Sequence, residues 1–236
     1  MYKTELHCHS AEVSRCSSAS ANDIVNLYCE MGYSTIVLTN HFSRKTFGEG
    51  NIKKLGNIPS FADASWDEKI DHFMSGYHKL KEAAEGRLNI IFSAEISFKG
   101  TNGHFLLYGV TEQFLRDHPN MIYEDPKEFS HVLRDNGVYL IQAHPFRDSN
   151  IIMKPSYLDG IEVYNGGPKD YRGDIAVAWA EKFKLTQTSG SDFHHCKRPP
   201  NGGIATSFPI TTIEELIEIL KSGNYKIIRD GEYSEK

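Results

Sequence analysis

The chain has 236 residues, of which 39% are hydrophobic and 24% are charged. This composition supports an ordinary buried core and excludes an intrinsically disordered chain. A formal net charge of −5 and an isoelectric point near 6.1 give no overall attraction to nucleic acid or to an anionic membrane. Long nucleic acid is therefore not expected as a partner, although a local basic pocket is compatible with this net charge. The length suits a single domain spanning residues 1–236, because α/β barrels often exceed the usual domain size.

The sequence has no pattern typical of secretion or of membrane insertion. Residues 1–6 lack the apolar run of a secretion signal, and no stretch approaches the roughly 18 apolar residues of a transmembrane helix. We therefore expect a cytoplasmic protein with no membrane partner, and the sequence leaves its oligomeric state open. Reduced thiols are expected for the four cysteines, which form no CxxC pair: Cys8, Cys16, Cys29 and Cys196.

Strand and helix patterns alternate along the chain. Strands are expected at residues 2–7, 34–38, 88–94, 104–110, 138–142, 160–164, 185–189 and 225–228. Helices are expected from Ser20 to Gly32, over 66–85, from Pro126 to 136, over 171–184 and over 213–221, and residues 43–65 have loop character. Repeated β-then-α units predict an α/β fold with a parallel sheet, either open or closed.

Polar side chains follow the ends of the expected strands. In α/β barrels the chemistry lies on the loops after the carboxyl ends of the strands, so we expect these side chains to meet at one rim. The residues in these positions are His7, His9, Asn40, His41, Glu95, His104, His144, Asp192, His194 and His195. The other histidines lie on expected helices or loops without partners and are expected to be solvated: His72, His78, His118 and His131.

The residue types at this rim are typical metal ligands. In the pair His7-x-His9 both imidazoles point the same way along an extended chain and can reach one ion. Neutral imidazole together with carboxylate suits zinc, manganese or iron. A carboxylate such as Glu95 can bridge two ions, and two ions about 3.5–4 Å apart can share a water and convert it to hydroxide at neutral pH. The sequence therefore predicts two or three divalent metal ions as cofactors.

Six short segments contain these residues in a fixed order. They are LHCHS at 6–10, LTNH at 38–41, AEI at 94–96, GHFL at 103–106, AHP at 143–145 and GSDFH at 190–194. This order resembles that of the PHP family, the polymerase and histidinol phosphatase family, and it covers nearly the whole chain, from residue 6 to about 195. The resemblance implies a distorted (β/α)7 barrel with a trinuclear metal centre and phosphoesterase activity.

The resemblance also implies which residues bind each metal. The ligands of the first metal would be His7, His9, Glu95 and Asp192. The second metal would share Glu95 and add His104 and His144. The third would take His41 and His194, with one more ligand from the loop after His9.

Two positions depart from the family pattern. Asn40 stands where the family usually has Asp before the histidine, and we expect it to change how His41 is oriented. In the loop after His9 the family commonly supplies Asp or His, and here either Arg15 or Cys16 falls at that place. Cys16 is either a thiolate ligand suited to zinc or a small buried thiol. Arg15 cannot bind a metal, but its charge could replace one or hold a phosphate.

A negatively charged phosphate ester suits a rim that holds metal cations. Metal ions would neutralise the ester oxygens, and a bridging hydroxide would attack phosphorus in line with the leaving oxygen. Asp192 is the expected catalytic residue, because it could bind the first metal and also hold the hydroxide. Arg147 lies in an HPxR segment that resembles the family pattern, and we expect it to clamp the phosphate. His195 is either a proton donor to the leaving alcohol or an exposed neighbour without a task, and Glu162 is expected to support the ligands.

Several functions are compatible with this reading. We expect small phosphorylated metabolites or nucleotides as substrates, with a nuclease that trims short oligonucleotide ends as the alternative enzyme. A non-catalytic metal-binding scaffold is a further alternative, as is an amidohydrolase, although those usually have a bridging lysine where this chain has Glu95. Residues 43–65 could cover the site, and aromatic side chains near them could offer a surface for a base or ring: Phe42, Phe47, Phe61 and Trp66.

Overall fold

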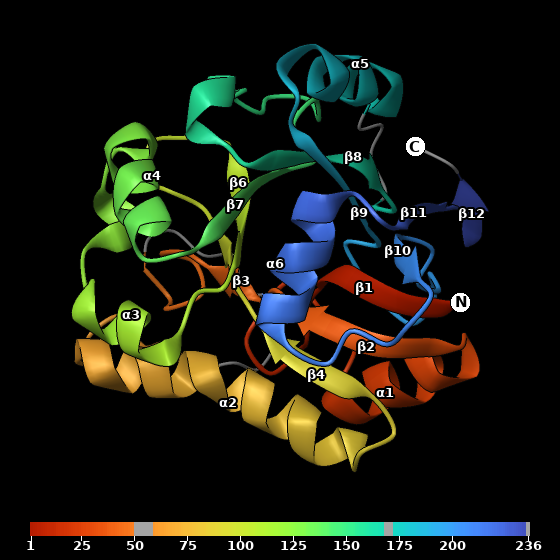
Figure 1. Cartoon of the computed structure of the whole chain (residues 1–236). Helices are drawn as coiled ribbons and strands as arrows, with labels where there is room; N and C mark the ends of the chain where they lie inside the picture. The colour runs from red at the N-terminus through yellow and green to blue at the C-terminus, as the bar shows by residue number, and fades with distance from the viewer. Residues whose placement is uncertain (50–58, 168–171, 235–236) are drawn as a thin grey trace.

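The computed structural model describes residues 1–49, 59–167 and 172–234. Its strands form two six-stranded sheets, with the orders β12-β11-β10-β1-β2-β4 and β3-β5-β6-β7-β8-β9 (Figure 1). The first sheet contains β1 (Tyr2–Cys8), β2 (Tyr33–Leu38), β4 (Asn89–Phe92), β10 (Gly203–Thr206), β11 (Lys226–Arg229) and β12 (Glu232–Ser234). The second contains β3 (His41–Phe42), β5 (Glu95–Ile96), β6 (His104–Tyr108), β7 (Tyr139–Ala143), β8 (Gly160–Asn165) and β9 (Thr186–Gly190).

The mixed α/β fold is as expected, but the strand pairing is only partly parallel. Strands β1, β2 and β4 are parallel neighbours, as are β7, β8 and β9. In contrast, β5 and β6 are antiparallel, because the connection between them is too short for a helical crossover. Strand β6 is also antiparallel to β7, and β1 is antiparallel to β10. The expectation of an all-parallel sheet was therefore wrong.

The expected (β/α)7 barrel is not confirmed, because the two sheets do not close into one. Individual contacts nevertheless join them at two places. At one of them the hydroxyl of Ser93, just after β4, donates to the carbonyl of Leu107 in β6 over 2.9 Å. At the other Cys8, at the end of β1, forms an isolated parallel bridge with Phe193, just after β9. These contacts bring the carboxyl ends of strands from both sheets to one place.

Six helices are described: α1 (Ala21–Glu30), α2 (Trp66–Ala84), α3 (Glu112–Asp117), α4 (Pro126–Asp135), α5 (Gly173–Phe183) and α6 (Ile213–Ser222). Short 3-10 turns occur at η1 (Met121–Tyr123) and η2 (Pro155–Tyr157). Helices α1 and α2 pack against each other below β2 and β4, whereas α5 lies beside β8 (Figure 1). The sequence signals for helix ends are confirmed at Ser20, which forms a capping box with Asp23, and at Pro126. Residue 171, the expected start of the helix that became α5, lies outside the described residues. No helix in the described part of the chain is both long and apolar enough to cross a bilayer.

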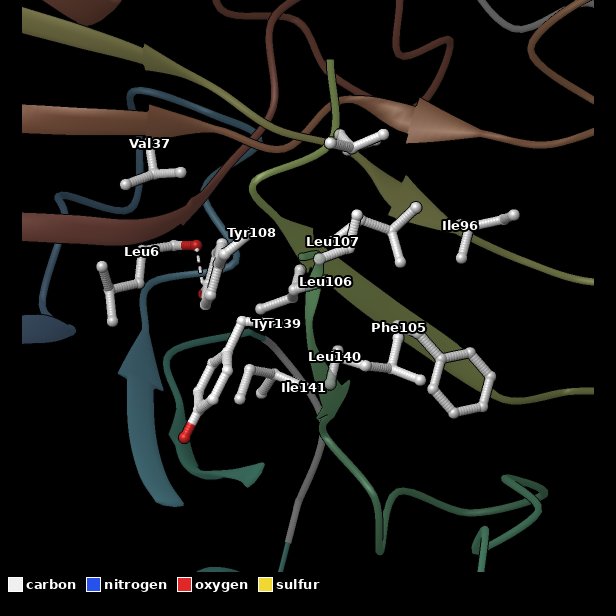
Figure 2. Close-up of a cluster of buried hydrophobic side chains, with 14 of the residues drawn as sticks. Leu6, Val37, Ile96, Phe105, Leu106, Leu107, Tyr108, Tyr139, Leu140 and Ile141 are labelled. Atoms are coloured by element: carbon white, nitrogen blue, oxygen red, sulfur yellow. Dashed lines mark hydrogen bonds between the residues drawn. The ribbon is translucent and has the colours of Figure 1, made fainter. Parts of the chain in front are cut away.

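The largest hydrophobic cluster fills the space between the sheets. Leu6 from β1, Leu106 and Tyr108 from β6 and Ile141 from β7 are all fully buried there (Figure 2). The hydroxyl of Tyr108 donates to the carbonyl of Leu6 over 3.0 Å, which links the second sheet to the first. Full burial of one such side chain stabilises the fold by roughly 1.5–3 kcal/mol. This core fixes β1 and β6, the two strands that carry His7 and His104.

The four histidines that were expected to be solvated divide into two pairs. His78 and His131 are exposed, as expected. His72 and His118 are half-buried, because each ring stacks on a phenylalanine that is close in space: Phe61 at 4.1 Å and Phe114 at 4.1 Å. For these two the expectation was wrong, because stacking on a phenylalanine covers one face of the imidazole ring.

His72 should make the protein less stable in mild acid. Burial, together with the charges of Arg15 and Lys79, lowers the pKa of His72 from 6.5 to about 4. The neutral ring is therefore favoured in the folded state, so its contribution is complete above pH 6.5 and is lost as the pH falls toward 4. We expect His72→Phe, which keeps the stack on Phe61, to reduce the loss of unfolding free energy between pH 7 and pH 4.5 by about 1–2 kcal/mol. Urea unfolding of both proteins at the two pH values measures this, and parallel losses would contradict it.

Candidate metal centre

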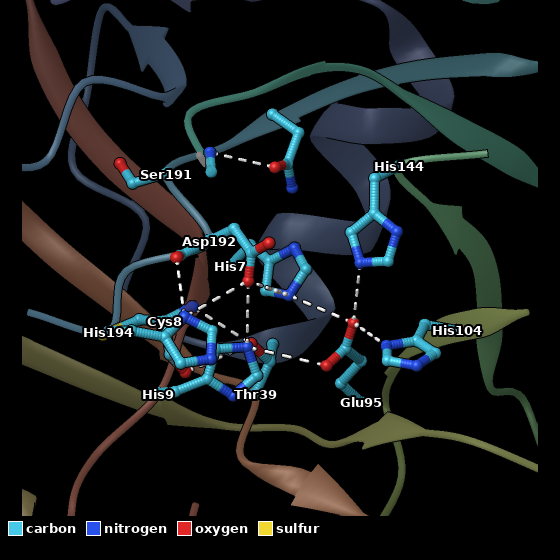
Figure 3. Close-up of polar contacts among 12 residues, drawn as sticks. His7, Cys8, His9, Thr39, Glu95, His104, His144, Ser191, Asp192 and His194 are labelled. Atoms are coloured by element: carbon cyan, nitrogen blue, oxygen red, sulfur yellow. Dashed lines mark hydrogen bonds and ion pairs between the residues drawn. The ribbon is translucent and has the colours of Figure 1, made fainter. Parts of the chain in front are cut away.

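Glu95 is the centre of the candidate site. Its side chain is fully buried and both carboxylate oxygens face imidazole nitrogens (Figure 3). Oε1 lies 3.0 Å from Nδ1 of His104, 3.2 Å from Nε2 of His144 and 3.4 Å from Nε2 of His7. Oε2 lies 3.6 Å from Nε2 of His9 and 2.5 Å from Nδ1 of His41. One carboxylate thus lies beside five histidines from four different segments of the chain.

Strand register explains how these segments meet. Strands β3 and β5 are parallel and pair His41 with Glu95 directly. Strands β6 and β7 are antiparallel and pair His104 with Ala143, which places His104 next to His144. His144 follows the end of β7 and His104 opens β6, as expected, whereas His41 and Glu95 open strands of only two residues each. Strands this short leave no periodic pattern in the sequence.

Asp192 provides the second buried carboxylate. Its Oδ1 lies 3.4 Å from Nε2 of both His7 and His9 and 3.5 Å from Nδ1 of His194. The next residue, Phe193, is held against β1, since its carbonyl accepts from the amide of His9 over 3.0 Å. This backbone contact places Asp192 across from the HxH pair, and in Figure 3 dashed lines join its carboxylate to the rings of His7 and His9.

Two residues of the cluster have strained backbones. Asp192 has a φ of 49° and His144 a φ of 31°, in the left-handed region that L-residues avoid. Such a conformation costs about 1–3 kcal/mol and persists only where surrounding contacts fix it. For His144 one of these contacts is its amide, which donates to Glu162 Oε2 over 2.9 Å. Strain at two neighbouring polar residues is typical of a functional site.

The donor set fits divalent metal ions. Four groups of three ligand atoms lie within 4.8 Å of one another: His9, His41 and His194; His7, His9 and Glu95; His7, His144 and Asp192; His41, Glu95 and His104. Within the described residues, Nε2 of His7 and Nε2 of His9 are buried without a hydrogen-bond partner. Each such atom costs roughly 1–3 kcal/mol when nothing satisfies it. Because these atoms converge on one point, a shared cation would satisfy both of them.

Glu162 supports His7 and His144 through atoms that do not face the cluster, as expected from its place on a strand. Its Oε1 lies 2.9 Å from Nδ1 of His7, and its Oε2 accepts from the amide of His144 and from Nδ2 of Asn165. A carboxylate at Nδ1 fixes the imidazole tautomer and leaves Nε2 of His7 directed at the cluster.

Two supporting residues show what the sequence reading missed. Asn40 does not contact the ring of His41. Its Oδ1 accepts instead from the amide of Ser10 over 2.8 Å and from the hydroxyl of Ser14 over 2.9 Å. That serine oxygen lies 3.3 Å from Nδ1 of His9 and accepts from the amide of His41 over 3.0 Å. The effect of Asn40 on His41 therefore passes through Ser14, which has no distinguishing pattern in the sequence.

Cys16 and Arg15 occupy different places. The Sγ of Cys16 lies 3.1 Å from Nε2 of His41 and also interacts with the ring of His194. Burial raises the pKa of the Cys16 thiol, but its hydrogen bonds to His194 and His41 outweigh that effect and bring it to about 6. The guanidinium of Arg15 donates instead to backbone carbonyls of Lys45 and Pro59. Cys16 is thus the residue that lies beside the two histidines of the expected third site.

Arg147 and His195 lie at the edge of the cluster. Nη2 of Arg147 donates to Oδ2 of Asp192 and to Oδ1 of Asn165, each over 2.7 Å. Its side chain is half-buried, close enough to the carboxylates to meet a substrate there. His195 is largely exposed, and its Nδ1 lies 2.8 Å from the hydroxyl of Ser18. Its pKa is lowered by partial burial and by nearby positive charge.

The aromatic surface expected near the site is not present. Phe42 and Phe47 are fully buried and pack edge-on against each other and against Trp66. Phe61 is engaged in its stack on His72. These rings belong to the hydrophobic core, because edge-to-face packing buries their faces. Residues 50–58 of the expected covering loop lie outside the described residues.

Comparison with known proteins supports the fold. No protein-family model and no curated protein sequence matches the chain. A two-domain protein from Bacteroides vulgatus, containing a predicted PHP-like metal-dependent phosphoesterase, superposes with a TM-score of 0.66 at 17% identity over 98% of this chain. The present chain spans 66% of the length of that protein.

Two further structures are similar in fold. One is a candidate metal-dependent phosphoesterase from Bifidobacterium adolescentis, with a TM-score of 0.55 and 14% identity over 93% of this chain and 96% of that one. The other is an amidohydrolase from Chromobacterium violaceum with bound sulfate and no metal, with a TM-score of 0.55 and 13% identity over 97% of this chain and 98% of that one. At these identities the likeness concerns the fold. The resemblance indicated by the six segments is thereby confirmed for the fold: the chain has a PHP-like α/β fold, and it contains a cluster of potential metal ligands.

Proposed function

We propose that this protein is a PHP-family phosphoesterase that hydrolyses phosphate esters of small metabolites or nucleotides with the help of two or three divalent metal ions. One observation carries the proposal. Two buried carboxylates, Glu95 and Asp192, lie within about hydrogen-bonding reach of imidazoles from several strand ends, with the guanidinium of Arg147 beside them. That arrangement combines cation ligands with a binding group for phosphate oxygens.

The groups that the side chains form support the expected ligand assignment in part, since His144 groups with His7 and Asp192 and not with His104. His7, His9 and Glu95 form one group, and the expected first metal adds Asp192 to them. The expected second metal shares Glu95 and takes His104 and His144, both of which lie near Oε1. The third would take His41, His194 and the thiolate of Cys16. Ions held there would neutralise phosphate oxygens and activate a water as the nucleophile.

The protein's own groups have distinct tasks in this proposal. The two carboxylate oxygens of Asp192 face different groups. Its Oδ1 lies near His7 and His9, and its Oδ2 lies near Arg147. It can therefore bind a metal and align the attacking water. Within the described residues Nε of Arg147 is buried without a hydrogen-bond partner, so this group has a donor left for a phosphate oxygen. His195 is exposed at the edge and can be reached by the leaving oxygen of a bound ester.

The alternative functions are less well supported by this geometry. A scaffold without activity would be expected to lack ligand residues, whereas the sequence contains every residue expected to bind the first and second metals. In the family of amidohydrolases a lysine usually bridges the metals, and here Glu95 is in the central position. A nuclease acting on short oligonucleotide ends uses the same chemistry, and only substrate comparison separates it from a phosphatase of metabolites. A cytoplasmic location remains part of the proposal.

Metal content and phosphate release together test this function. Elemental analysis of protein purified without added metal should give about two or three divalent ions per chain. The same sample should release phosphate from members of a panel of monoesters and cyclic diesters. Fewer than about one ion per chain, with no activity after addition of zinc, manganese or iron, would instead favour the scaffold. Activity confined to short oligonucleotides would favour the nuclease.

A further inference from the structure

We propose that a cationic cavity beside the metal centre binds a second anionic group of the substrate. The preferred substrate would then be a phosphate ester whose leaving part carries another phosphate or a carboxylate. This inference rests on the proposed function and narrows its substrate class. The experiments that test it distinguish a failure of this inference from a failure of the proposed function.

The cavity opens directly onto the candidate metal centre. It has a volume of about 470 Å³, and its lining includes His41 and His104, the two histidines that lie nearest to Glu95. Cys16 also lines it. A phosphate bound at the metal centre would therefore project the rest of the molecule into this space, which is large enough for a small metabolite.

The charges that line the cavity are mainly positive. Four cationic side chains contribute to it: Arg15, Arg44, Lys45 and Lys99. Among the lining residues that the structure describes, Glu49 is the only carboxylate. It is already engaged by Lys69 at 2.9 Å, by Arg44 at 3.4 Å and by the hydroxyl of Tyr123. Glu49 therefore does not neutralise the two lysines.

Lys45 and Lys99 have no counter-charge of their own. Both are exposed, and neither forms an ion pair with any residue in the described part of the chain. The Nζ of Lys99 lies 5.4 Å from the ring centroid of Tyr123, a contact that leaves its charge in place. Residues 50–58 contain no Asp or Glu. Cations of one sign at a concave surface raise the local concentration of anions.

The segment that carries Lys45 is fixed relative to the metal centre. It follows β3 directly, and the hydroxyl of Thr46 donates to the carbonyl of His41 over 2.6 Å. Nε of Arg15 donates to the carbonyl of Lys45 over 3.1 Å. These bonds hold the turn against the ligand His41. The position of the lysine charge is therefore set by the same backbone that positions the ligand.

The lining also disfavours other leaving groups. A phosphorylated amino alcohol would bring an ammonium group among these cations, which repel it. A nucleobase would need a large aromatic face to stack on, and Phe98, the one Phe, Tyr or Trp among the described lining residues, is 2% exposed. A compact, multiply charged anion fits this cavity better than a cation or a neutral ring.

A series of esters that differ in charge tests the proposal. The metal-loaded full chain is assayed with phosphoethanolamine, 1,3-propanediol monophosphate and 1,3-propanediol bisphosphate, whose reacting groups are all primary esters. We expect kcat/KM to rise along this series, by about tenfold between the last two. Similar kcat/KM values for the three esters would overturn the inference but leave the proposed function standing.

A variant that lacks two of the cavity's charges, together with a matched control, tests whether the cavity causes the preference for the bisphosphate. The double substitution Lys45→Gln with Lys99→Gln should lower kcat/KM for the bisphosphate about tenfold, and that for the monophosphate much less. Lys79→Gln removes an exposed lysine of α2 that does not line the cavity, and it should preserve the preference. An equal loss for both esters in the double variant would contradict the proposal.

A binding measurement keeps the two proposals separable if no ester is hydrolysed. Calorimetric titration of the bisphosphate into metal-loaded wild-type protein should show tighter binding than titration into the double variant, by about tenfold. Unchanged affinity would overturn the inference whatever the turnover. Weaker binding by the variant without hydrolysis in any assay would support the cavity and count against the phosphoesterase.

Discussion

Replacing Glu95 with Gln should lower phosphate release about 1000-fold and reduce the metal content of the protein. Glu95 is the one carboxylate whose two oxygens both face imidazoles, and its side chain is fully buried. Glutamine has nearly the same shape but no charge, and it offers an amide donor where a ligand oxygen is needed. Because the centre would be shared between ions, the loss of this single group should weaken more than one of them.

Elemental analysis and phosphate release from the best monoester measure this effect. Glu181→Gln on the exposed face of α5 is the control, and it should retain both metal and activity. Should the glutamine variant fold poorly, Glu95→Asp keeps the charge with a shorter reach and should retain part of the metal. A full complement of metal in Glu95→Gln, together with near-normal rates, would show that the carboxylate is not the shared ligand.

Replacing Cys16 with Ala should remove one ion per chain and lower kcat by about 10–100-fold. Sγ of Cys16 lies 3.1 Å from Nε2 of His41, and the ring of His9 stacks at 4.2 Å from that of His41 and 4.3 Å from that of His194. These four side chains provide sulfur and nitrogen donors in one place. Such a set suits zinc or iron better than manganese.

The cobalt-substituted protein gives a readout that does not depend on turnover. Wild-type protein should show a thiolate-to-cobalt charge-transfer band, which Cys16→Ala should lack. Cys16→Asp, with the oxygen ligand that the family commonly has in this loop, should regain the ion without the band. Cys29→Ala, at a half-buried thiol on α1, should behave as wild type. The same metal content in wild type and Cys16→Ala, with the band still present, would mean that Cys16 is a structural thiol.

The sequence by itself determined most of the local structure and the chemical type of the site. Ser20 and Asp23 mark a helix start because a side chain can cap nearby amides without help from the rest of the fold. The six ordered segments predicted the candidate ligand residues, since metal chemistry requires particular donors. Glu162 could be assigned a supporting task from its strand position. These inferences depend on neighbouring residues or on functional groups, both of which a sequence displays directly.

The tertiary structure decided the features that depend on contacts between distant segments. The antiparallel pairing of β5, β6 and β7 and the two-residue strand β3 arise from strand partners that local patterns do not specify. Only packing brought Cys16, and not Arg15, next to His41, because a shift of one residue along a loop changes which side chain points inward. The charge of the cavity likewise depends on Lys45 and Lys99 meeting across the fold, with Glu49 engaged elsewhere. Long-range contacts determine each of these features, because the free energy of those contacts exceeds that of any local conformational preference along the chain.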